Sequence, residues 1–96
     1  MVTNADDVRA VLKTLANGTQ KGNKLVNSEA EMVALYKTLG QNGTSIETTG
    51  DAAGVLLKRL ADGTELAFRP FSKTNGKATI EIWYPGTTRI RKVHVR

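Results

Sequence analysis

The residues best suited to chemistry lie in the last third of the chain, between Arg69 and Arg96. This stretch holds the single histidine, His94, the single tryptophan, Trp83, and a glutamate, Glu81, among several lysines and arginines. An imidazole can hold or release a proton near neutral pH, a carboxylate can accept one, and cations stabilise negative charge that develops during a reaction. These side chains favour acid–base chemistry on a phosphate-containing substrate.

Cleavage of RNA is one reaction that needs such groups and no metal. A base takes the proton from the ribose 2′-OH, an acid protonates the departing 5′-oxygen, and cations stabilise the phosphorus centre, which leaves a 2′,3′-cyclic phosphate. We expect His94 to be the acid and Glu81 the base. The expected phosphate cations of this catalytic site are Arg69 and Lys92. Further substrate or phosphate contacts are expected from Ser72, Lys73, Thr79, Trp83 and Arg91.

The same residues also have ordinary structural interpretations. A lone histidine near a C-terminus is more often a surface residue than a catalyst. Glu81 can form a simple cross-strand ion pair with a lysine, which is its more common role in a sheet. A single tryptophan in a small domain usually belongs partly to the core, although Trp83 can also stack on a base.

The composition argues against several other classes of protein. The 96 residues include no cysteine and one histidine, so neither a disulfide framework nor a metal site is predicted, and no cofactor is expected. The apolar runs are too short to span a bilayer, and the acidic N-terminus is unlike a signal peptide. Ser72–Gly76 lacks the glycine spacing of a P-loop, and no nucleophile elbow of a serine hydrolase is found.

The positive charge is concentrated in the second half of the chain. Residues 1–52 carry five basic and six acidic side chains, for a net charge of −1, whereas residues 53–96 carry nine basic and three acidic ones, for +6. A one-sided excess of this kind favours a polyanionic partner, usually a nucleic acid, because neutralised phosphates release counterions. The alternative is that the surplus lysines serve solubility alone.

Two amphipathic helices are predicted in the first half. The first is capped by Thr3 or Asn4 and ends at Gly18. The second opens on a capping box, Ser28 to Glu31, and stops at Gly40. Residues 19–27 are predicted to be a flexible connector, and residues 41–54 a loop with a short extended piece. Both helices are short and amphipathic, so each must pack its apolar face on another element.

Four strands are predicted in the second half, at residues 55–61, 64–71, 78–84 and 88–95. Asp62-Gly63 and Pro85-Gly86 mark turns between them. The first three alternate regularly, but the fourth does not, because Ile90 falls in one phase and Val93 in the other. A single bulge at Arg91-Lys92 would bring both of these apolar side chains inward.

The turn at Pro85-Gly86 suggests how the last two strands pair. A register with Tyr84 opposite Arg89 places Thr79 opposite His94 and Glu81 opposite Lys92. The expected helix-free face then carries most of the chemically active side chains. They are Arg69, Thr79, Glu81, Trp83, Lys92 and His94, with Ser72 and Lys73 on the adjoining loop.

The predicted fold is therefore a single α+β domain of residues 1–96. A helical part, residues 1–52, supplies two N-terminal helices that pack on one face of a twisted four-stranded antiparallel β-meander. The meander, residues 53–96, carries the active site on its other face. We expect the free domain to be a monomer.

An ordered set of short motifs resembles a known family. The set is Asp62-Gly-Thr, Arg69-Pro-x-Ser-Lys, Gly76, Thr79-Ile-x-Ile, Pro85-Gly and Lys92-Val-His94. It is similar to the C-terminal ribonuclease domains of bacterial polymorphic and contact-dependent inhibition toxins, in the barnase/EndoU/colicin/RelE group. The similarity covers roughly residues 55–96, and each motif alone is weak.

The resemblance implies a helical segment on a twisted antiparallel sheet and metal-independent RNase activity, often on tRNA. It also implies secretion from a producer cell, action in the cytoplasm of target bacteria, and a cognate immunity protein that blocks the site. By position, the active-site residues would be Arg69, Ser72, Lys73, Thr79, Lys92 and His94. Members differ in the groups that act as acid and base, so the resemblance does not assign a role to Glu81.

Two other functions remain open at this point. The same basic face can bind RNA or DNA without catalysis, in which case His94 is dispensable for function. Alternatively, the chain is a protein-interaction domain such as an immunity protein or an adaptor. Immunity proteins of basic nucleases tend to be acidic, which argues against that role for a chain with a net charge of +5.

Overall fold

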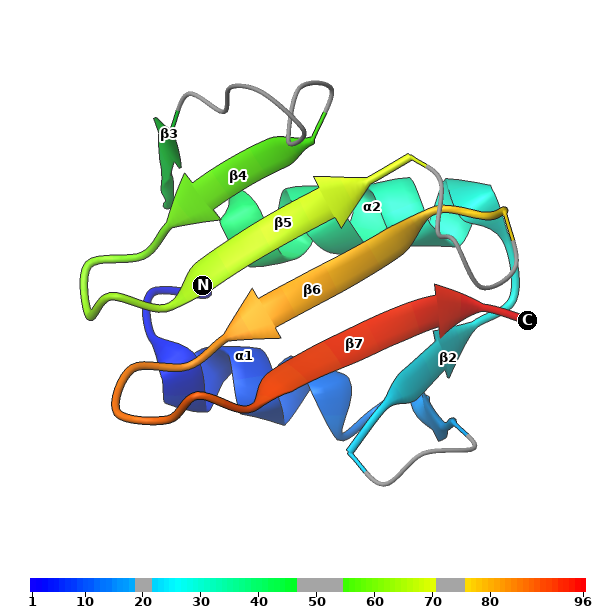
Figure 1. Ribbon diagram of the computed structural model, residues 1–96, viewed down its shortest axis with the longest axis horizontal. Coiled ribbons are helices and arrows are strands. Elements are labelled where there is room, and N and C mark those ends of the chain that lie inside the picture. Colours follow the sequence, from blue (N-terminus) through cyan, green and yellow to red (C-terminus); the bar gives the residue numbers. More distant parts are fainter. Residues whose placement is uncertain (19–21, 47–54, 71–75) are drawn as a thin grey trace.

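The computed structural model describes residues 1–18, 22–46, 55–70 and 76–96. These residues form an α+β domain in which two helices lie behind a twisted sheet of seven strands (Figure 1). The elements, in chain order, are α1 (Ala5–Leu12), β1 (Ala16–Asn17), β2 (Lys24–Val26), α2 (Glu29–Gly40), β3 (Thr44–Ile46), β4 (Leu56–Arg59), β5 (Glu65–Arg69), β6 (Thr79–Trp83) and β7 (Ile90–Val95).

The predicted four-stranded antiparallel meander is wrong, because the sheet has seven strands within the described residues and is mixed. Its order is β1-β2-β7-β6-β5-β4-β3. Strands β4 to β7 do pair antiparallel with their chain neighbours, but β3 extends this run at one edge. At the other side β2 pairs with β7 in parallel, and β1 folds back on β2. Three strands thus come from residues 1–52, where two helices, a connector and a loop with one short extended piece were predicted.

Both helices begin at the predicted caps. The Asn4 side chain accepts a hydrogen bond from the Asp7 backbone N–H at 2.9 Å, and Ser28 Oγ accepts one from the Glu31 N–H at 3.1 Å. The Glu31 carboxylate reaches back to the Asn27 N–H at 2.6 Å, which completes the capping arrangement of α2. Helix α1 is shorter than predicted and ends at Leu12, since the chain then turns into β1. Neither helix is long and apolar enough to cross a membrane.

The core lies between the helices and one face of the sheet. Alternation along β6 directs Ile80 and Ile82 inward, where both side chains are fully buried. Helix α2 supplies Met32 and Leu39 to the same core, and its Tyr36 ring packs 5.5 Å from the ring of Phe68 in β5. The inward and outward faces predicted for the second and third expected strands are confirmed. The sheet face without helices is therefore the place to look for a site.

The predicted bulge in the last strand is also wrong. The pairing of β6 with β7 is continuous from Thr79 opposite His94 to Trp83 opposite Ile90. Ile90 consequently stays on the helix-free face, where 39 % of it is exposed. Val93, the other residue that the bulge was meant to bring inward, is buried in the core. The contact with Trp83 across the strands gives Ile90 an apolar neighbour without a change of phase.

Strand β2 joins the two halves of the domain. Its residues 24–26 pair with Val93, His94 and Val95, and the Arg96 N–H donates to the Val26 carbonyl at 2.9 Å. Val26 is buried against the same core as Val95. The flexible connector predicted from the polar composition of residues 19–27 is therefore wrong for residues 24–26, which are too few to show an alternating pattern.

We predict that Tyr36→Phe lowers the free energy of unfolding. The Tyr36 hydroxyl donates to the carbonyl oxygens of Leu56 (3.0 Å) and Leu66 (3.2 Å), and burial raises the pKa of Tyr36 to about 12. Loss of the hydroxyl leaves these carbonyls short of a donor at the helix–sheet interface and should cost about 1–2 kcal/mol. Urea unfolding measures the difference. An unchanged midpoint would show that the two bonds do not stabilise the packing of α2.

Candidate active site

The helix-free face brings six of the nine predicted site residues together on three neighbouring strands. On β6, Thr79 pairs with Arg69 of β5 and with His94 of β7. Glu81, two residues further along β6, pairs with Lys92 of β7. Trp83 follows on the same side of β6. We call these six residues the sheet-face cluster: Arg69, Thr79, Glu81, Trp83, Lys92 and His94. The predicted register of the last two strands is confirmed.

Glu81 lies at the centre of the cluster with a charge on either side. It is buried, with 8 % of the residue exposed, although it faces away from the helices. Its Oε1 accepts a hydrogen bond from Arg69 Nε on β5, and its Oε2 lies 3.8 Å from Lys92 Nζ on β7. A buried carboxylate must be paired to remain charged, so Glu81 fixes the positions of both cations.

The cations themselves are accessible. The side chains of Arg69 and Lys92 are 41 % and 42 % exposed, compared with 10 % for the side chain of Glu81. Their charged ends therefore border the solvent while their carboxylate partner lies beneath them. An anion that approaches this face meets two positive groups about one strand spacing to either side of β6.

His94 lies on the same face, two residues beyond Lys92 on β7. Its Nδ1 is 3.5 Å from Thr79 Oγ1, a hydroxyl that is almost fully buried. Burial of the ring lowers the pKa of His94, the nearby Lys92 ammonium lowers it further, and Glu81 opposes both effects. The net result is a pKa below the ordinary histidine value of 6.5, so the imidazole is neutral at physiological pH.

The far end of the cluster is apolar. Trp83 is half-buried and faces Ile90 on β7, and its partner on β5 is Glu65. Glu65 in turn forms an ion pair with Arg59 at 2.6 Å. A half-exposed indole next to an exposed isoleucine offers a flat surface on which a base can stack.

The three remaining predicted site residues are not in the cluster. Arg91 lies opposite Ile82, so it points toward the helix side of the sheet. It does not share the face of His94, because alternation sends neighbouring residues of a strand to opposite faces, and its predicted phosphate contact would have to be made on the helix side. Ser72 and Lys73 fall outside the described residues.

Sequence reasoning missed the surroundings of His94 on the β2 side. Leu25 pairs with His94, and the Lys92 N–H donates to Asn23 Oδ1 at 3.3 Å. These residues come from a polar segment nearly seventy positions away in the sequence. No local pattern marks them, because a parallel pair between distant segments leaves no periodic signal of its own.

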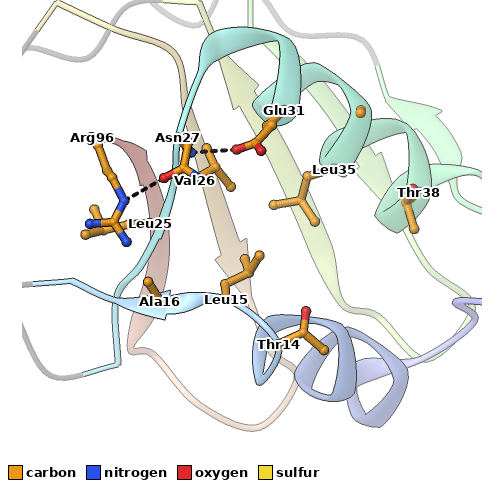
Figure 2. Close-up of a pocket in the computed structure, with 11 residues that line it drawn as sticks. Thr14, Leu15, Ala16, Leu25, Val26, Asn27, Glu31, Leu35, Thr38 and Arg96 are labelled. Carbon is orange, nitrogen blue, oxygen red and sulfur yellow. Dashed lines mark hydrogen bonds between the residues drawn. The ribbon is translucent and has the colours of Figure 1, made fainter.

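A pocket of about 390 Å³ lies elsewhere, where β1 and β2 meet the two helices (Figure 2). Leu15, Leu25 and Leu35 line it, and a chain of hydrogen bonds runs along one side. Arg96 Nε donates to Asn27 Oδ1 at 2.8 Å, and the Asn27 N–H donates to Glu31. None of the nine predicted site residues lines this pocket. Its polar groups are largely satisfied by one another.

Among the described residues, no group of three or more histidine, cysteine, aspartate or glutamate side chains is arranged to hold a metal ion. The chemical groups that the cluster does offer are an imidazole, a carboxylate, two cations and a hydroxyl. Comparison with protein-family models, with curated proteins and with solved structures finds no match to this chain. The family resemblance thus depends only on the motifs quoted for it.

We predict that two charge-removing variants shift the pKa of His94 in opposite directions. Lys92→Met removes a charge that lowers this pKa, so the value should rise; Glu81→Gln removes one that raises it, so the value should fall. NMR titration of the ring protons measures both, and the single histidine makes their assignment unambiguous. The control is Lys37→Met on the exposed side of α2, which should leave the pKa unchanged. Shifts of the same sign in both variants would contradict the arrangement.

Proposed function

We propose that the protein is an endoribonuclease that cleaves RNA by attack of the ribose 2′-OH on the adjacent phosphorus. The observation that carries the proposal is the sheet-face cluster, in which the His94 imidazole lies two residues from the accessible Lys92. Both face the same way on β7, so their Cα atoms are roughly 6–7 Å apart. Such a spacing suits two groups that flank a single phosphate on its attacking and leaving sides.

The charges favour a different division of roles from the one expected from the sequence. Both oxygens of Glu81 are engaged by cations, so this carboxylate is poorly placed to accept a proton from a ribose. His94 is neutral at physiological pH and can accept one. We therefore assign the base to His94 and the acid to the Lys92 ammonium, with Glu81 as the group that positions the cations.

The protons balance under this assignment. His94 takes the proton of the 2′-OH as the oxygen attacks the phosphorus, and the bond from phosphorus to the 5′-oxygen breaks. Lys92 donates a proton to that leaving oxygen, while Arg69 stabilises the charge on the non-bridging oxygens. The products are a 2′,3′-cyclic phosphate and a 5′-hydroxyl. Proton return from His94 to Lys92 through water restores the starting state.

The charge and the exposed aromatic side chain of this face indicate the kind of RNA that it can bind. The net charge of +6 in residues 53–96 favours a polyanion, and Trp83 beside Ile90 favours an unpaired base over a continuous duplex. A tRNA, which presents unpaired bases in loops, fits both. Delivery into neighbouring bacteria and a cognate immunity protein remain predictions of the family resemblance.

Non-catalytic RNA binding on the same face is the second candidate. One observation favours it: the ion pairs of Glu81 with Arg69 and Lys92 are sufficient to explain why these residues lie together. In that case His94 has no catalytic role, and its replacement leaves RNA binding intact. The effect of replacing His94 therefore distinguishes the two candidate functions.

We expect purified protein to cleave RNA in the presence of EDTA, and His94→Ala to reduce the rate by roughly 10²-fold or more, which is the usual contribution of a general base. RNA binding by the variant, measured by fluorescence anisotropy, should be nearly unchanged because the ring is neutral. Lys37→Ala, a remote cation on α2, is the control and should cleave at the wild-type rate. Full activity in a folded His94→Ala variant would favour the non-catalytic candidate.

The pH dependence tests which proton His94 transfers. As a base, its neutral form is the active one, so kcat/KM should rise with pH through a value below 6.5 and then level off. As an acid, its protonated form would be required, and kcat/KM would fall over the same range. A profile between pH 4.5 and 8 distinguishes the two. A fall through this range would return the acid role to His94.

A further inference from the structure

A second group of cations lies on the helix side of the sheet. Four basic side chains, from α1 and the residue after it, β2 and β7, surround a shallow pocket of about 230 Å³. They are Arg9, Lys13, Lys24 and Arg91, and we call them the basic pocket. Leu12, Gly22 and Tyr84 complete its lining, and none of the described residues that line it is acidic. Within residues 1–18, 22–46, 55–70 and 76–96, the acid paired with a member is Asp6, which lies 3.2 Å from Arg9 and is highly exposed.

The arginines of the basic pocket are held in place by packing. The Arg9 guanidinium lies over the Tyr84 ring, 4.2 Å from its centroid. Burial raises the pKa of Tyr84, and the charges of Arg9 and Arg91 both oppose the increase, so both guanidinium groups are close to this side chain. A tyrosine at the end of β6 thus anchors one arginine from a helix and one from a strand.

Gly22 makes room for Arg91. A Cβ atom at position 22 would lie 2.2 Å from Arg91 Nη1, and the backbone there has a φ of +87°, which favours glycine. The segment before β2 therefore lies directly against the guanidinium. Lys24, two residues later, donates from Nζ to Asn17 Oδ1 at 2.7 Å, which orients a third cation of the pocket.

Strand β7 connects the basic pocket to the sheet-face cluster. Arg91 and Lys92 are consecutive, so alternation directs one to each face of the sheet. The ladder with β2 begins at Val93, and the two residues before it, Gly22 and Asn23, lie beside Arg91 and Lys92. Both cations lie close to the first residue of β7, Ile90. A flexible polyanion that passes around this end of β7 can contact cations on both faces of the sheet.

We propose that the basic pocket is a second phosphate-binding site for the RNA backbone, which holds the RNA as it continues from the sheet-face cluster around the start of β7. This inference extends the proposed function, since the ligand is the same RNA. It assigns to Arg91 a phosphate contact on the helix side instead of one beside His94. Each cation that neutralises a phosphate releases counterions, so the pocket should contribute to the salt dependence of binding.

Binding of a single-stranded 2′-O-methyl oligoribonucleotide of about 16 nucleotides tests the proposal. This probe lacks the free 2′-OH, so it is bound without being cleaved. The variant is Lys13→Gln with Lys24→Gln, which leaves both packed arginines in place. We expect it to bind roughly tenfold more weakly near 0.1 M salt and to lower the slope of log K against log salt by about 1.4.

The matched control is Lys37→Gln with Lys58→Gln, which removes two lysines from a separate depression on α2 and β4. It should retain wild-type affinity and slope, and thermal unfolding should show that both double variants are folded. Wild-type binding by Lys13→Gln/Lys24→Gln would overturn the proposal, as would an equal loss in the control. Loss of binding to poly-L-glutamate without loss of RNA binding would also overturn it, and would assign the pocket to an acidic protein.

The outcome is independent of catalysis. If the wild type binds this probe through the basic pocket but cleaves no RNA, the proposed ribonuclease is rejected and the second site stands. If the wild type cleaves RNA and Lys13→Gln/Lys24→Gln binds the probe as the wild type does, the second site is rejected and the proposed ribonuclease stands.

Discussion

The burial of the Glu81 carboxylate is the constraint on which the rest of the site depends. A charged oxygen pair on the central strand of a sheet is stable only with positive groups beside it, and Arg69 and Lys92 meet this need from the two adjacent strands. The cations are thereby fixed at the surface of a face that no helix covers. His94 and Thr79 lie in the next row of the same face, so the ion pairs also determine what surrounds the imidazole.

Strand β6 links this site to the stability of the fold. Its inward side chains, Ile80 and Ile82, are fully buried against the helices, while Thr79 and Glu81 face the opposite way. A shift of one residue in the pairing of β6 would exchange these two sets and place a carboxylate in the apolar core. The hydrophobic pattern that holds the sheet on its helices is therefore also what keeps the acid–base groups together.

Several elements could be predicted from the sequence because their signals are local. Asn4 and Ser28 cap helices through hydrogen bonds to nearby N–H groups, and the turn at Pro85-Gly86 is short enough to determine the register that follows. That register placed Glu81 opposite Lys92 and Thr79 opposite His94. The members of the sheet-face cluster follow from it.

The features of the fold and site that could not be predicted depend on contacts between segments that are distant in the sequence. Strand β2 has three residues and pairs in parallel with β7, so neither its length nor its composition marks it as part of the sheet. Ile90 was expected inward because apolar side chains usually are, but Trp83 provides it with an apolar neighbour on the exposed face. Arg91 was predicted as a phosphate contact from its charge and its position beside Lys92, and this prediction did not place it on either face of the sheet. The ion pair of Glu81 with Lys92 was predicted as the ordinary structural role of this residue, whereas its pair with Arg69 is seen only in the structure.

Ribonuclease chemistry that starts from the 2′-OH leaves a distinctive product. The most direct measurement is the chemistry of the fragment ends after incubation of the folded protein with total bacterial RNA in EDTA. The account predicts fragments that carry 2′,3′-cyclic phosphates and 5′-hydroxyls. Intact RNA, or fragments that end in 3′-hydroxyls and 5′-phosphates, would contradict it.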